Sequence, residues 1–258
     1  MVRHARAAEH EATPRPLIAV GNDYPDGHLH PAHAHRRGQF LHAERGIMMV
    51  ATETGGWVVP PQAGVWIPGG IVHSIRMLGA VATRSVYLEP EAAARLPGTC
   101  QVLGVAPLLR QLLIAAVDLP LEYPSEGRAA HLVGLLLAEL AQAPPLPFCL
   151  PAPAEPRLAA ACRRFCARPD IGEETEDWCG ALGMSRRGFT RLFRAETGLS
   201  FREWQRRACL QAALPRLAAG ERVTAVALDL GYASPAAFTA MFSQLVGMSP
   251  QSWARLAG

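Results

Sequence analysis

The stretch LGMSRRGFTRLFRAETGLSF, residues 182–201, has the pattern of a turn followed by a helix with two unlike faces. Gly183 suits the turn, Ser185 is a typical helix-capping residue, and Gly198 is a typical helix end. Apolar residues recur at helical spacing along one side, at Phe189, Leu192 and Phe193. We therefore expect a helix that begins after Ser185, ends before Gly198 and buries its apolar side.

The other side of this helix is cationic. It carries Arg187, Thr190, Arg191 and Arg194, at positions i, i+3, i+4 and i+7. An exposed row of arginines fits a helix in the major groove of DNA, where arginine pairs with guanine through two hydrogen bonds. The alternative is a solvated cationic face, which is the simpler explanation for a unit that stands alone.

The unit does not stand alone, because the same design returns in VALDLGYASPAAFTAMFSQLVGMSP, residues 226–250. Gly231 supplies the turn, Ser234 caps the next helix, and Pro235 takes its first position. The expected buried side consists of Phe238, Met241, Phe242 and Leu245. Two such units can contact successive segments of the major groove, about 34 Å apart.

A long helix is expected between the two units. It starts with the capping pair Ser200 and Glu203 and extends through SFREWQRRACLQAALPRLAAG, residues 200–220. Pro215 lies inside it, where proline removes a backbone hydrogen bond and clashes with the preceding turn. We expect a kink or a break at Pro215.

The two helix-turn-helix stretches and Trp253 resemble the AraC/XylS family of transcription regulators over about residues 157–255. The resemblance implies an all-α double helix-turn-helix domain that binds double-stranded DNA, with RNA polymerase as a further candidate partner. The wider pattern resembles bacterial regulators of efflux and drug-response genes. The implied DNA-facing residues are Ser185, Arg186, Arg187, Thr190, Arg191, Arg194, Ser234, Pro235, Ala236, Thr239, Ala240 and Gln244. Family members often carry a basic residue at the position of Ala240, so the second helix offers little to base edges in this chain.

Histidines are concentrated in DGHLHPAHAHRRGQFLHAERG, residues 26–46, which contains His28, His30, His33, His35 and His42. Alternate residues of a strand share a face, so His33 and His35 are expected to point into the same interior, with Gln39 at the same parity. Short strands rich in Val, Ile and Trp, separated by turns, follow over residues 39–90. This pattern indicates a small antiparallel barrel or sandwich.

Two segments resemble the two cupin motifs over about residues 25–90. The first is matched by Gly27, His33, His35, Gln39 and Gly46, with glutamine for the usual glutamate, and the second, PGGIVHSIRM at residues 68–77, by Pro68, Gly70 and His73. The resemblance implies one divalent metal (Zn, Ni, Fe or Cu) on His33, His35 and His73, with Gln39 as a weak neutral ligand. The other three histidines are then expected at the surface or behind the ligands. The alternatives are a polar core without metal and a pocket for a small organic effector.

The rest of the chain completes an α+β plan with two domains. Two apolar segments with a period near 3.6, residues 106–119 and 128–143, predict helices with enough apolar surface for a dimer interface. Six prolines within residues 143–156 indicate a stiff linker. The predicted divisions are a disordered N-terminal tail (1–15), a cupin-like sensor domain (16–90), a helical dimerisation segment (91–143), a proline-rich linker (144–156) and the DNA-binding domain (157–258).

Composition limits the class of protein. Half of the residues are hydrophobic, no apolar run is long enough to span a bilayer, and the N-terminal residues lack the apolar core of a signal peptide. All 25 basic residues are arginine, and residues 155–258 hold 14 of them against 10 acidic residues, which suits a polyanionic partner. Six cysteines without a CxxC pair indicate reduced thiols. We expect a cytoplasmic protein with no membrane partner.

These patterns predict a DNA-binding transcription regulator, not an enzyme. Its N-terminal domain would sense a metal or a small molecule and favour one arrangement of the DNA-binding domains. The first alternative is a cupin metalloenzyme, such as a dioxygenase or isomerase, fused to a DNA-binding domain, although Gln39 cannot act as a general base. The second is a regulator whose barrel serves only dimerisation. Bound metal and effector-dependent DNA affinity would distinguish the three.

Overall fold

The structure, a computed structural model, describes residues 13–257, which fall into two compact domains. The N-terminal domain runs to Thr52 and resumes over Trp57–Leu146, whereas the C-terminal domain comprises Glu53–Gly56 and the chain from Pro147 onward. Residues 1–12 of the predicted tail lie outside the described residues. Thr13 is buried, and its carbonyl oxygen accepts a hydrogen bond of 2.6 Å from Arg37.

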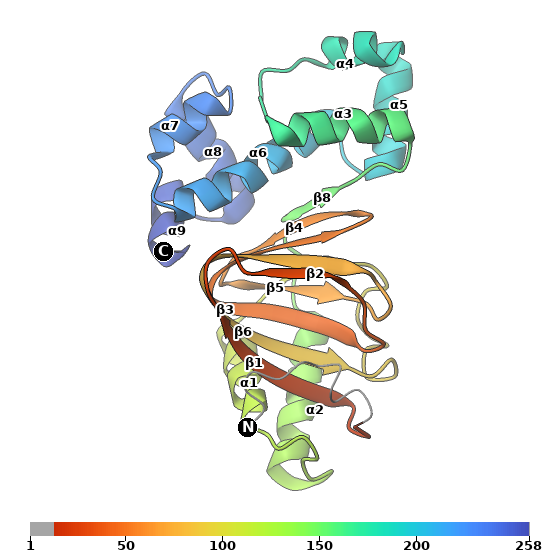
Figure 1. Cartoon of the computed structure of the whole chain (residues 1–258), viewed down its shortest axis with the longest axis vertical. Coiled ribbons are helices and arrows are strands. Elements are labelled where there is room, and N and C mark those ends of the chain that lie inside the picture. Colours follow the sequence, from red (N-terminus) through yellow and green to blue (C-terminus); the bar gives the residue numbers. More distant parts are fainter. Residues whose placement is uncertain (1–12, 258) are drawn as a thin grey trace. The chain divides into compact units, whose positions relative to one another are not determined.

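Strands β1 to β7 form the sheet of the N-terminal domain (Figure 1). They are β1 Leu17–Tyr24, β2 Leu29–His33, β3 Gly38–Thr52, β4 Gly55–Val59, β5 Ala63–Ile67, β6 His73–Leu88 and β7 Gln101–Gly104. β6 pairs antiparallel with β1, β2 and β3, and β5 pairs antiparallel with β3 and β7. The expectation of short strands alone is wrong, because β3 and β6 run for 15 and 16 residues and change partners along their length.

Helices α1 Pro107–Val117 and α2 Gly127–Gln142 belong to the same domain, and α1 packs on β1 and β6. The core includes Leu17, Phe40, Trp66, Val86, Leu109, Leu113 and Leu136. Phe40 fits beside β5 because Gly64 has no side chain: a Cβ there would lie 2.2 Å from the Phe40 ring. The strand β7 falls inside the segment predicted as helical, since four residues are too few to show a strand period.

Helices form nearly all of the C-terminal domain (Figure 1). They are α3 Pro156–Ala167, α4 Thr175–Leu182, α5 Arg186–Thr197, α6 Phe201–Ala218, α7 Val223–Asp229, α8 Pro235–Val246 and α9 Pro250–Ala257. Helix α6 contacts α3 and α5 as well as α7 and α9, so it joins two groups of helices. The segment expected as the linker contains a short strand, β8 Cys149–Pro151, and the first residue of α3.

The expected break of the linking helix is wrong, because α6 is assigned as one helix from Phe201 to Ala218. Pro215 lies in its last turn and removes one backbone hydrogen bond, and the helix nevertheless continues past it to Ala218. The predicted cap is confirmed: Ser200 accepts a hydrogen bond from the backbone of Glu203, and the Glu203 carboxylate accepts one from the backbone of Ser200.

The two helix-turn-helix units are built alike. In the first unit, α4 and α5, the rings of Phe189 and Phe193 pack against Trp178; in the second, α7 and α8, Phe238 and Phe242 are fully buried. The predicted apolar sides are thus confirmed in their aromatic members, whereas the flanking leucines of both helices are only half-buried. Within residues 13–257, no helix combines the length and apolar character needed to cross a bilayer.

Candidate metal-binding site and DNA-binding helices

The histidine site begins with the register of two strands. His33, the last residue of β2, and His73, the first residue of β6, are direct partners in the antiparallel pairing of these strands. Their ring centroids lie 4.4 Å apart. Two histidines that are 40 positions apart in the sequence therefore share one face of the sheet.

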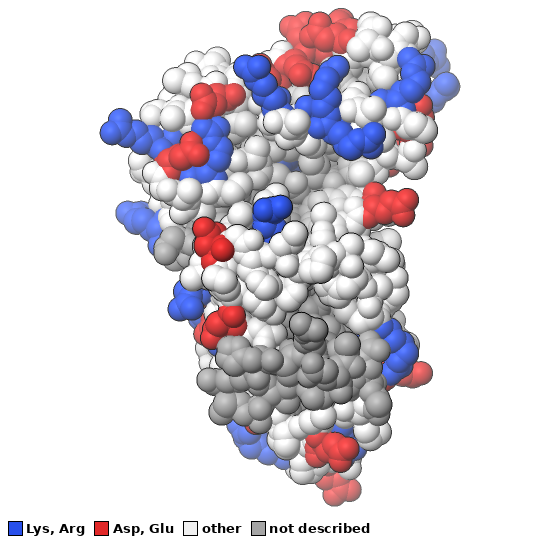
Figure 2. Space-filling view, viewed as in Figure 1, with Lys and Arg blue, Asp and Glu red and all other residues white. Residues whose placement is uncertain are grey.

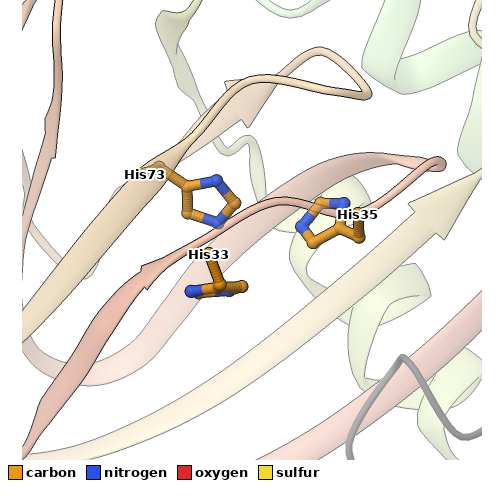
Figure 3. A group of neighbouring side chains, drawn as sticks. All are labelled: His33, His35 and His73. Carbon is orange, nitrogen blue, oxygen red and sulfur yellow. The ribbon is translucent and has the colours of Figure 1, made fainter.

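His35 joins the pair from the turn that follows β2. Its ring centroid lies 5.1 Å from that of His73 and 6.0 Å from that of His33 (Figure 3). The glycine turn before β6 fixes this turn, because the Gly70 amide donates to the His35 carbonyl over 2.8 Å. A side chain on Gly69 would prevent this approach, since its Cβ would lie 2.1 Å from the carbonyl oxygen of Arg36.

Each of the three imidazole rings is oriented by a backbone carbonyl oxygen two residues away in the chain. The Nδ1 atoms of His33, His35 and His73 lie 2.8, 2.6 and 2.9 Å from the carbonyl oxygens of Pro31, Arg37 and Ile71. A carbonyl only accepts hydrogen bonds, so each Nδ1 must carry the proton. Nε2 of each ring then carries no proton, although Nε2 of His35 has the Oε1 atom of Gln39 beside it at 3.1 Å. Metal-binding histidines are commonly oriented by such a hydrogen bond of the second nitrogen.

His73 is the most protected member of the group. It is 1% exposed, and its Nε2 is buried without a hydrogen-bond partner. Burial, together with the neighbouring histidines, lowers the pKa of His73 to about 4, so its ring is neutral at pH 7. His33 is exposed and His35 half-buried, which leaves the group open to solvent on one side.

Gln39 and Tyr87 complete the surroundings. The Oε1 atom of Gln39 lies 3.1 Å from Nε2 of His35, and the Gln39 amide donates to the Tyr87 hydroxyl over 2.8 Å. Gln39 and Tyr87 are direct partners in the pairing of β3 with β6, and the Tyr87 ring meets His35 edge-on at 5.2 Å. Burial raises the pKa of Tyr87, so its hydroxyl stays protonated at neutral pH.

The donor set fits a divalent transition metal. The ligand atoms of His33, His35 and His73 all lie within 4.8 Å of one another. A tetrahedral zinc site with Zn–N bonds of about 2.0–2.1 Å places its ligand atoms about 3.4 Å apart, a separation of the same order. Three imidazoles with an adjacent amide oxygen equally suit Ni, Fe or Cu.

The other three histidines are placed differently. His28 and His30 are half-buried, and their rings extend the group, with His30 6.2 Å from His33. A surface position for His42 is wrong: it is 0% exposed, and its Nδ1 donates to the carbonyl oxygen of Ala63 over 2.8 Å. His42 has the parity of Phe40 on β3, and that face packs toward α1.

Helix α5 of the first unit exposes its cationic side, as predicted. Ser185, Arg186, Arg187, Thr190, Arg191 and Arg194 are all exposed. Ser185 also caps the helix by accepting a hydrogen bond from Gly188, and Arg186 forms an ion pair of 2.6 Å with Glu176. Figure 2 shows arginine side chains over the helices of the C-terminal domain, interspersed with acidic ones.

Helix α8 of the second unit has a different surface. Ala236, Ala240 and Gln244 are exposed, whereas Ser234, Pro235 and Thr239 are half-buried. Ser234 caps the helix by accepting from the Ala237 amide over 3.2 Å, as predicted. The face of α8 therefore offers small side chains and few charges.

Two features of the sites were absent from the sequence analysis. Tyr87 reaches Gln39 only through the register of β3 and β6, which no local pattern reveals. The carbonyl oxygens that orient the histidines belong to Pro31 in β2 and to Arg37 and Ile71 outside the strands, and each lies two residues from its histidine in the chain.

A sheet-rich N-terminal domain and two capped helix-turn-helix units joined by one helix define the protein as a helix-turn-helix regulator. Residues 16–146 match the family model described as AraC-like ligand binding domain, and residues 178–256 match the helix-turn-helix domain. The HTH-type transcriptional regulator NimR of Escherichia coli (strain K12) is 34% identical over 241 residues, covering 93% of this chain and 87% of NimR. The chain belongs to the AraC family of transcription regulators, with a DNA-binding and a ligand-binding domain.

Solved structures give more distant likenesses. ToxT from Vibrio cholerae O395, bound to (E)-4-(8-methylnaphthalen-1-yl)but-3-enoic acid, is 10% identical with a TM-score of 0.41, covering 95% of this chain and 100% of that one. The DNA-binding domain of AdpA in complex with a target DNA is 27% identical with a TM-score of 0.35, covering 40% of this chain and 91% of that one.

Proposed function

We propose that this regulator binds one divalent metal ion at His33, His35 and His73 in a cupin-like N-terminal domain, and that the ion changes its affinity for DNA. The observation that carries the proposal is the orientation of the three rings. All three Nδ1 atoms are held by backbone carbonyls, which leaves the three Nε2 atoms to bind an ion, and one ring nitrogen of each residue lies within 4.8 Å of the others. The buried, unpartnered Nε2 of His73 lacks only such a ligand.

Gln39 supports a cation at this place. Its Oε1 faces Nε2 of His35 at 3.1 Å, and both atoms are acceptors when Nδ1 of His35 carries the proton. A metal ion between them turns this repulsion into coordination, whereas a rotated amide group would relieve it without metal. Gln39 is neutral, so the site would hold its ion less firmly than one with a carboxylate, as suits a sensor that must also release it.

DNA binding is proposed to use both reading helices unequally. The exposed arginines of α5, among them Arg187 and Arg191, suit direct contacts with base edges. The caps and small residues of α8 suit contacts with the phosphate backbone. Genes of efflux or drug response remain the predicted targets on the resemblance alone.

A homodimer is also proposed. Leu108 of α1 is 49% exposed and Leu135 of α2 is 44% exposed, on helices whose other sides are buried in the core. Burial of such leucines against a second copy is favourable. Sedimentation of wild type and of a Leu108→Glu, Leu135→Glu double variant tests this: the variant should be monomeric, and an unchanged mass would contradict it.

The metalloenzyme alternative is less favoured. The side chain that faces His35 is the amide of Gln39, which cannot take up a proton as a general base. A bound ion would instead act by joining β2 to β6 through His33 and His73.

Metal analysis of the purified protein tests the proposal. Inductively coupled plasma mass spectrometry, on protein dialysed separately against Zn, Ni, Fe and Cu, should find about one ion per chain for at least one metal. His33→Ala should lose it, because two imidazoles and an amide make a weak site. His33 is exposed, so its removal should leave the fold intact.

His28→Ala is the matched control, since His28 belongs to the same stretch but not to the ligand group. It should retain the ion. DNA affinity, measured on a duplex selected from a random library, should then differ between the metal-loaded and metal-free wild type. A wild type that binds no ion, or a His33→Ala variant with unchanged metal content, would overturn the proposed site.

A further inference from the structure

The loop between α3 and α4, residues 168–174, touches the second helix-turn-helix unit although it belongs to the first. The amide of Ile171 donates to the carbonyl oxygen of Leu230 over 2.9 Å. Leu230 follows α7 directly and precedes the turn glycine Gly231. A backbone hydrogen bond therefore joins the two units in addition to the linking helix α6.

Helix α6 holds this loop from its other side. Arg202 donates to the carbonyl oxygen of Ile171, and Gln205 donates to the carbonyl oxygen of Glu173 over 2.9 Å. Gln205 is 1% exposed, and Ile171 is 4% exposed. Both backbone groups of Ile171 are thus fixed, one by the second unit and one by α6.

Asp170 brings the loop close to the turn of the second unit. Its Oδ1 accepts a hydrogen bond of 2.8 Å from the Gly172 amide, which shapes the loop. The same oxygen occupies the place of a missing side chain, because a Cβ on Gly231 would lie 1.8 Å from it. Gly231 therefore meets two demands: a positive φ of 74° in the turn, and room for the carboxylate of Asp170.

We propose that Asp170, Ile171 and Arg202 form a brace that sets the position of the second reading helix relative to the first. This inference rests on the proposed function, because it requires both α5 and α8 to contact DNA. Helix α6 is the first connection between the two units, and Pro215 removes one of its backbone hydrogen bonds. The brace supplies a second connection, through the hydrogen bond from Ile171 to Leu230. Spacing between the two contacted DNA segments is then specified by this loop as well as by α6.

Operators of altered spacing test the brace with the full-length protein. The probe is the tightest-binding duplex selected from a random library, with one or two base pairs inserted or deleted between its two contacted segments. Wild type should lose affinity on the altered duplexes. Asp170→Ala and Arg202→Ala should lose several-fold less, because a looser second unit can follow the displaced segment.

The ratio of affinities for altered and original duplexes is the deciding quantity, since a merely structural defect lowers both alike. Equal ratios in wild type and both variants would overturn the brace. A wild type that tolerates every spacing would instead contradict the use of both reading helices. The two failures are therefore distinguishable.

A double-mutant cycle tests the contact itself. Gly231→Ala should weaken DNA binding more in wild type than in the Asp170→Ala background, with a coupling of about 3- to 30-fold, because the clash needs the carboxylate. Gly183→Ala is the matched control: Gly183 has the same role in the first unit and a φ of 63°, but its nearest neighbour is Arg157 at 4.0 Å. Its effect should not depend on Asp170, and a Gly231 cycle without coupling would overturn the contact.

Discussion

His33 and His73 are direct partners across β2 and β6, with ring centroids 4.4 Å apart. The pairing of these strands is irregular, with a register shift between His30 and His33. An ion bound by both rings would connect the strands where their hydrogen-bond ladder is interrupted. Occupancy of the site should therefore govern how firmly β2 is held.

Removal of the ion should lower the thermal stability of the wild type. A ligand present at 100 to 1,000 times its dissociation constant contributes about 2.7–4.1 kcal/mol to the folded state. We expect a chelator to lower the melting temperature of the wild type and to have no effect on His33→Ala. His131→Ala, an exposed substitution on α2, should respond to the chelator as the wild type does. An equal chelator effect in His33→Ala would contradict this assignment.

Arg187→Ala or Arg191→Ala should weaken specific DNA binding by about 1–3 kcal/mol and relax the preference at one part of the site. Both arginines are exposed beside Thr190 on α5. Dissociation constants on the selected and a scrambled duplex measure the effect. Arg163→Ala, on the exposed side of α3, is the control with the same charge change. Equal losses on both duplexes would mean that the two arginines contact only phosphates.

Ala240→Arg should tighten DNA binding, because it adds a cation to an exposed position of the nearly uncharged face of α8. At least the non-specific component should rise, with a steeper dependence of the binding constant on salt. Titrations at several salt concentrations measure both. Unchanged affinity and slope would show that α8 does not lie against the duplex.

His42 should make the protein sensitive to acid. Burial, the largest cause, lowers its pKa from 6.5 to about 4 in the folded state. The unfolded chain therefore binds the proton first, and stability falls as the pH decreases from about 6.5 to about 4, by about 3 kcal/mol in total. Above pH 6.5 the contribution is complete.

His42→Gln should accordingly show a shallower loss of unfolding free energy over this range, measured by urea unfolding at successive pH values. His131→Gln is the control, because His131 is exposed. If wild type and His42→Gln lose stability in parallel between pH 6.5 and 4, the buried ring of His42 does not titrate as described.

Local signals in the sequence were sufficient to predict the helix-turn-helix units. Capping by Ser185, Ser200 and Ser234 depends on residues within one turn, so the helix starts could be predicted. The break expected at Pro215 was wrong, because proline removes only one backbone hydrogen bond and the last turn is retained: the Ala219 amide donates to the Pro215 carbonyl oxygen over 3.0 Å.

The structure of the N-terminal domain was harder to predict, because it depends on contacts between residues that are distant in the sequence. Motif spacing suggested His33, His35 and His73 as a group, but their approach rests on the register of β2 with β6. The burial of His42 could not be predicted from the sequence, because residues of both parities are buried in the first half of β3.

Helices α5 and α8 each contain 12 residues and begin at the same kind of cap, yet one face is rich in arginine and the other in alanine. The two faces differ in their side chains, so the two units are not equivalent. On the proposed function, a duplex that suits them has a stringent end and a tolerant end in a fixed order. Inverting that duplex within a promoter would turn the bound protein around, so the orientation of its site carries information in addition to the bases.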